Sequence, residues 1–110
     1  MFPEASIVYG IDLGLLDVDD IIKLDSVWST HKTVELANYG EEDDVEYSML
    51  IIKANLPSVI CEAQPFDPTK LIATPDWDKD LKNALKDINT ILKTPIKNKP
   101  KWFLIELYGG

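Results

Sequence analysis

The sequence predicts an α+β domain with a four-stranded, mainly antiparallel sheet and two helices on one face of that sheet. Three observations lead to this prediction: segments in which apolar residues alternate at the period of a strand, two segments with helical spacing, and their order along the chain. The 110 residues, 45% of them hydrophobic, are the size of one domain. We therefore expect a single domain over residues 1–110.

The first strand is predicted over residues 6–13, where Ile7, Tyr9 and Ile11 alternate with small or polar side chains. Asp17 follows in the position of a helix N-cap, and apolar residues then recur at helical spacing. The sequence therefore predicts a helix from about Val18 to Val27.

The segment from residue 29 to 44 has a weaker pattern. Alternation over residues 32–36 predicts a short or edge strand. Residues 38–40, Asn-Tyr-Gly, are typical of a turn, and the four consecutive acids at 41–44 resist burial. We expect a turn followed by a solvated loop.

Val45 to Lys53 is the clearest strand, because its β-branched and aromatic residues become apolar on both faces near residues 50–52. Residues 54–57 read as a turn, and residues 58–62 as the return strand of a hairpin. Prolines at 65, 68 and 75 indicate a connecting loop.

The second helix has the strongest signature, with Thr74 as N-cap and Pro75 at the first helical position. Its apolar stripe comprises Trp77, Leu81, Ala84, Leu85, Ile88 and Leu92. Thr94-Pro95 ends this helix, and residues 101–108 predict a final strand. The resulting βαββαβ order resembles the ferredoxin-like arrangement, with an extra edge strand as a variation.

The charge of the chain indicates which kinds of molecule it is suited to bind. The net charge is −8, and all eleven basic residues are lysine, so the arginine fork that suits phosphate and guanine is missing. Residues 1–69 carry −11 and residues 70–110 carry +3. We therefore expect a basic protein surface as partner, rather than direct binding of nucleic acid.

Several features that are absent or rare in the sequence bear on the cellular location and the cofactors of the protein. The longest apolar run, residues 49–52, is far short of a membrane span, and residues 1–4 have no secretory character. Cys61 is the single cysteine, which favours a reducing cytoplasm. No phosphate loop or cofactor motif is present, so we expect no cofactor.

Asp12, Asp17, Asp19 and Asp20 are the densest group of potential metal ligands. One alternative is therefore a metal-dependent hydrolase or nuclease that uses Asp12 with a carboxylate such as Asp17, Asp20 or Glu62. Helix capping and the helix dipole already account for the three acids at 17–20. Asp12 alone has no structural explanation in the sequence. His31 is the only histidine, so no histidine pair is available for a metal.

An acidic stretch flanked by aromatic residues is the favoured candidate site. It predicts a binding face in which carboxylates steer a partner and an aromatic side chain anchors it; its residues are Trp28, Tyr39, Glu41, Glu42, Asp43, Asp44, Glu46 and Tyr47. A solvated loop is the commoner meaning of such a charge run, and it stays open beside the binding face. We thus expect a non-enzymatic protein that masks a basic surface, such as an immunity protein, antitoxin or phage-type inhibitor of a toxin or nucleic-acid-processing enzyme. A small-ligand sensor that dimerises through its sheet is the further alternative.

Overall fold

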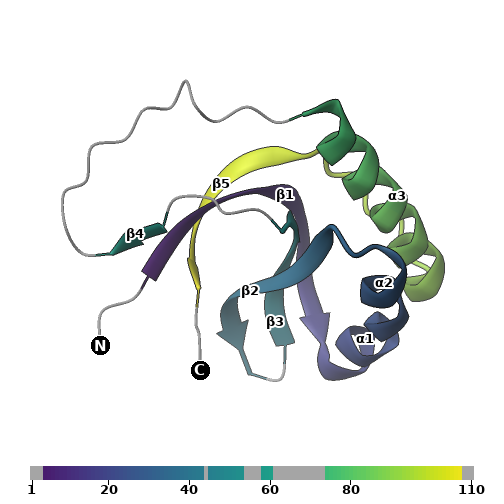
Figure 1. Ribbon diagram of the computed structural model, residues 1–110. Helices are drawn as coiled ribbons and strands as arrows, with labels where there is room; N and C mark the ends of the chain where they lie inside the picture. Colours follow the sequence, from purple (N-terminus) through teal and green to yellow (C-terminus); the bar gives the residue numbers. More distant parts are fainter. Residues whose placement is uncertain (1–3, 44, 54–57, 61–73, 108–110) are drawn as a thin grey trace.

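The computed structural model describes residues 4–43, 45–53, 58–60 and 74–107. These residues form an antiparallel sheet with helices packed against it (Figure 1), so the predicted α+β class is confirmed. The predicted turn at residues 54–57 and most of the proline-rich loop lie outside the described residues.

The long strand β1 (Glu4–Asp17) organises the sheet, because three other strands pair with it. Its first half pairs on one edge with β5 (Lys101–Leu107), and its second half pairs on the other edge with β3 (Val45–Ile52). The short strand β4 (Ser58–Ile60) pairs with the start of β1 on the same edge as β3. The hairpin predicted between β3 and residues 58–62 is therefore wrong, since β4 continues along β1 instead of turning back on β3.

The strand β2 (Val34–Glu42) pairs with the free side of β3 and is longer than the sequence predicts. The turn predicted at residues 38–40 is wrong, because a register shift between Asn38 and Gly40 accommodates these residues inside the strand. The predicted loop at 41–44 is wrong in its first half, because Glu41 and Glu42 pair with β3.

The first helical region begins at the predicted N-cap, Asp17, but it consists of two short helices. Helix α1 covers Val18–Lys23 and helix α2 covers Asp25–Thr30, so a continuous helix over 18–27 is wrong. The break lies at Leu24, which is fully buried. The chain changes direction where this apolar side chain enters the core.

Helix α3 (Pro75–Leu92) confirms the prediction at both ends, with Thr74 accepting a hydrogen bond from the Trp77 amide and Lys93 ending the helix in a left-handed conformation. It packs with α1 and α2 on the convex side of the bent sheet (Figure 1). Their shared core is built mainly from β1, β3, α2 and α3, with Ile11, Leu24, Leu50, Leu81 and Ile88 at its centre.

A second, smaller core occupies the opposite, concave face of the sheet. It consists of Val8, Ala37, Met49, Ile51 and Ile105, with Tyr39 and Phe103 packed against it. The outer strands β2 and β5 approach each other, with Cα atoms within 8 Å, although neither is the sheet neighbour of the other. The sheet is therefore curled, and its concave face buries side chains between its own edges.

Candidate functional site

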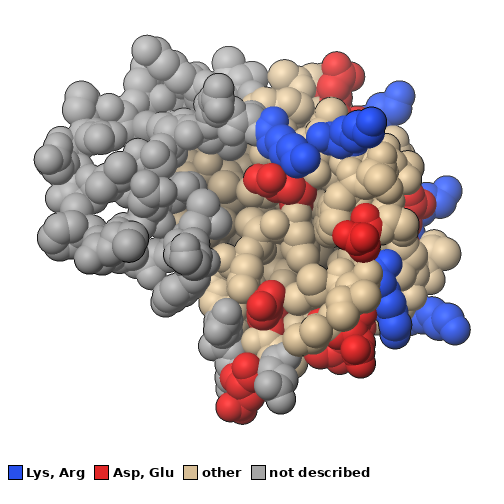
Figure 2. Space-filling view, turned by 60° about the horizontal axis from the view of Figure 1, so that its bottom comes forward, with Lys and Arg blue, Asp and Glu red and all other residues tan. Residues whose placement is uncertain are grey.

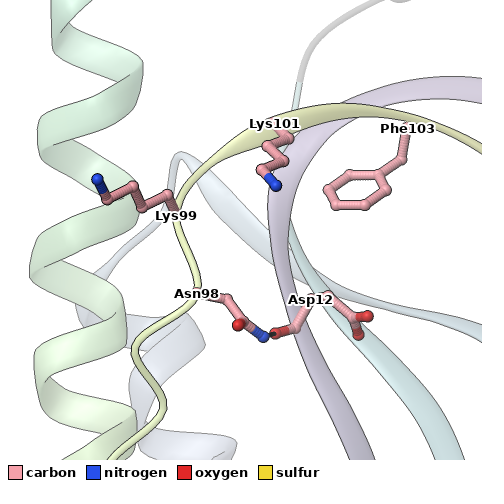
Figure 3. A pocket seen from close by; sticks show the side chains of 5 residues that line it. All are labelled: Asp12, Asn98, Lys99, Lys101 and Phe103. Carbon is pink, nitrogen blue, oxygen red and sulfur yellow. Dashed lines mark hydrogen bonds between the residues drawn. The ribbon is translucent and has the colours of Figure 1, made fainter.

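A recess opens on the concave face of the sheet, beside the point at which the segment before β5 contacts β1. It has a volume of about 210 Å³ and is lined by Asp12 of β1, by Asn98 and Lys99 from the segment before β5, and by Lys101 and Phe103 of β5 (Figure 3). Residues from both ends of the chain therefore form one polar site.

The Asp12 carboxylate is held in a fixed orientation. Its Oδ1 atom accepts hydrogen bonds from the Tyr39 hydroxyl at 2.8 Å and from the Gly14 amide at 2.9 Å. Gly14 adopts a left-handed φ of 76°, at the bulge where the register between β1 and β3 shifts. In the described part of the chain no hydrogen bond reaches Oδ2.

The hydroxyl of Tyr39 is held in its protonated form as a hydrogen-bond donor to this carboxylate. Burial of its ring, the hydrogen bond to Asp12 and the negative charge of Asp12 together raise the pKa of Tyr39 to about 12. The hydroxyl therefore keeps its proton at neutral pH. Asp12, which the sequence left without a role, is thus part of a built arrangement.

The other side of the recess is basic and aromatic. Lys101 and Phe103 point into the recess in Figure 3, whereas the amino group of Lys99 points towards α3. Asn98 donates from Nδ2 to the main-chain oxygen of Asp12 at 2.8 Å. The sequence analysis missed this side of the site, because a basic connector gives no signal that it lies beside a residue 86 positions away.

The predicted acidic and aromatic residues are only partly brought together. The rings of Tyr39 and Tyr47 lie 5.7 Å apart, and Leu15 is directly opposite Tyr47 in the pairing of β1 with β3. We call Leu15, Tyr39 and Tyr47 the tyrosine patch. Leu15 is 47% exposed, so the patch offers apolar surface to solvent.

The acidic residues lie at the end of the β2 and β3 hairpin beside this patch. In the backbone register Glu41 pairs with Glu46, and Glu42 with Val45. Asp43 is exposed and turns the chain with a left-handed φ of 55°. Asp44 lies outside the described residues.

Trp28 is separated from the other predicted residues of the binding face. It belongs to α2 and is packed against the core on the convex side, while Tyr39 packs against the core of the concave face. The structure therefore does not place Trp28 beside the tyrosine patch.

The carboxylates that the sequence offers as metal ligands do not gather into one site among the described residues. Asp17 and Asp20 form a reciprocal capping box at the start of α1. Among the described residues, no group of three histidine, cysteine, aspartate or glutamate side chains comes close enough to hold a metal ion. His31 contacts Asp87 at 2.6 Å, while Cys61 and Glu62 lie outside the described residues.

Within the described residues, the helices are too short or too polar to cross a membrane. Comparisons with protein-family models, curated proteins and solved structures found no significant match to this chain.

Proposed function

We propose that this chain is a non-enzymatic binding protein that masks a basic surface of a partner protein, in the manner of an immunity protein, an antitoxin or a phage-type inhibitor. The observation that supports this most directly is the tyrosine patch beside the acidic end of the β2 and β3 hairpin. Aromatic and aliphatic anchors surrounded by charged groups are the usual composition of a protein interface.

The distribution of charge supports the same function. In Figure 2 the lower left of the described surface shows acidic side chains without lysines, whereas lysines line the upper and right margins. A one-signed region next to an apolar anchor accelerates encounter with an oppositely charged partner. The anchor then governs how long the complex lasts.

The test measures separately what the acidic hairpin and the apolar anchor contribute to binding. Immobilised wild type is used to retain proteins from a lysate of the source organism, beside a variant with Glu41, Glu42, Asp43 and Asp44 changed to their amides. A control variant neutralises four acids elsewhere, all of them exposed: Asp19, Asp25, Glu35 and Asp76. We expect a basic protein to be retained by wild type and control, and poorly by the hairpin variant.

Kinetics with that purified protein then test the mechanism. The hairpin variant should associate ~10-fold more slowly at low ionic strength, with the difference disappearing as salt screens the field. Leu15→Asn should mainly accelerate dissociation, whereas Ile22→Asn, at a position 65% exposed on α1, should change neither rate. Equal association by wild type, hairpin variant and control at every salt concentration would contradict the proposed function.

Two finer assignments belong with this proposal. The placement of β1 between β3 and β5, with β2 beyond β3, supports a ferredoxin-like arrangement, while the curl of the sheet and the strand β4 are additions to it. The single cysteine supports a cytoplasmic location.

A further inference from the structure

The recess around Asp12 has a feature that protein binding through the tyrosine patch does not require. It holds a carboxylate and an ammonium group that both face the same space, yet no ion pair joins Asp12 to Lys101 or Lys99 within the described part of the chain. Two opposite charges at a small cavity that do not neutralise each other are suited to a ligand that carries both charges.

The negative side of this site is oriented for one further partner. Oδ1 of Asp12 is saturated by Tyr39 and Gly14, which fix the plane of the carboxylate. No donor among the described residues reaches Oδ2, so within this part of the chain the atom keeps its capacity to accept from a ligand. Preorganisation of this kind lowers the entropic cost of binding.

The positive and apolar sides complete a site for a specific chemistry. Lys101 supplies three rotatable donors for an anionic group, and the partly buried ring of Phe103 offers an apolar wall. Asn98 donates from its amide nitrogen to the main chain of Asp12, which fixes the segment before β5 against β1 at the recess. The volume of about 210 Å³ equals that of roughly seven water molecules, so the ligand is small.

We propose that this recess binds a free α-amino acid with a small apolar side chain. The ligand's ammonium group donates to Asp12 Oδ2, its carboxylate accepts from Lys101, and its side chain packs on Phe103. The ligand contacts none of the acidic hairpin, although Tyr39, which orients Asp12, also belongs to the tyrosine patch.

The test is titration of the isotope-labelled full chain with L-valine, followed through its backbone amide resonances. Saturable shifts at millimolar concentration are expected for residues 12, 98, 101 and 103. N-acetyl-valine, which lacks the ammonium group, and valinamide, which lacks the carboxylate, should each bind ~10-fold more weakly or worse. Inorganic phosphate should not displace valine at equal concentration.

Two substitutions test whether Asp12 and Lys101 each bind one charged group of the ligand. Asp12→Asn keeps an oxygen for Tyr39 and Gly14 but replaces Oδ2 by an amide donor, so it should reduce valine affinity ~10-fold or more without unfolding the chain. Lys101→Gln should do the same, while Lys97→Gln, an exposed lysine outside the recess, should leave binding within about twofold.

Three results would overturn the proposal. The first is an absence of saturable shifts at these residues with valine or alanine. The second is unchanged binding of valinamide, which would mean a site for cations alone. The third is unchanged binding of N-acetyl-valine together with displacement by phosphate, which would mean an anion site on the lysines alone.

Discussion

The hydroxyl of Tyr39 donates a hydrogen bond of 2.8 Å to the carboxylate of Asp12, although β3 lies between the strands that carry them. This bond spans the concave face from β2 to β1 and connects the tyrosine patch to the recess. Its removal should therefore affect both stability and the orientation of Asp12.

Tyr39→Phe should lower the free energy of unfolding by about 1 to 2 kcal/mol, because a hydrogen bond to a charged acceptor is lost at a partly buried site. Denaturation by urea measures this loss. In an Asp12→Ala background the same change should cost much less, since its acceptor is gone. An equal cost in both backgrounds would show that the bond contributes nothing.

Two tyrosines should titrate far above the ordinary range. Burial and hydrogen bonds to Asp78 and Asp12, respectively, raise the pKa of Tyr9 and Tyr39 from 10.0 to about 12. Because the folded pKa is the higher one, the stabilisation is complete below pH 10.0 and is lost as pH rises towards 12.

Phenolate absorbance against pH measures these ionisations, and denaturation at each pH measures the stability. The double variant Tyr9→Phe and Tyr39→Phe should be less stable at neutral pH and should lose less of its stability over this alkaline interval. If every tyrosine of the folded wild type ionised together near 10.0, the environments described for Tyr9 and Tyr39 would be wrong.

Gly10 is the point at which β1 pairs with both β3 and β5. A Cβ atom there would overlap the carbonyl oxygen of Leu50, and backbone cannot move aside as a flexible side chain can. Gly10→Ala should therefore cost about 1 to 3 kcal/mol or more. Gly40→Ala is the matched control, because the atoms nearest to its Cβ belong to the side chain of Tyr47, the closest at 3.2 Å. Equal melting temperatures for the two variants would contradict this packing.

The apolar stripe of α3 should dominate the stability of the convex side. Leu81 is completely buried there, so Leu81→Ala should cost ~2–5 kcal/mol. The neighbouring Lys82 is exposed, and Lys82→Ala should change stability by less than about 0.5 kcal/mol. A loss below about 1 kcal/mol for Leu81→Ala would mean that α3 does not pack as described.

Local signals predicted α3 almost completely, because Thr74, Pro75 and a regular apolar stripe all act within one segment. The same is true of β3 and of the Asp17 cap. Where two local signals conflicted, the prediction was wrong. Asn38 to Gly40 resembles a turn, but a bulge absorbs these residues while pairing with β3 continues on both sides.

The recess could not be predicted from the sequence, because its residues come from distant segments of the chain. Asp12 and Asn98 meet only because β5 pairs with β1, and neither residue carries a pattern that identifies the other. The partner of β4 was likewise decided by the free edge of β1 and not by the nearest strand in sequence. Pairings between distant segments are set by the whole sheet.

The pairing of Glu4 with Leu107 has a consequence for how the chain is made. During synthesis residues 4–10 of β1 emerge long before residues 101–107, so this edge of β1 stays uncovered until β5 has left the ribosome. Such non-local pairing favours slow folding, with the hairpin of β2 and β3 able to form early and β1 and β5 joining later. A ribosome-stalled chain that lacks residues 101–107 should therefore remain sensitive to protease along β1, and the full-length chain, once released, should become resistant.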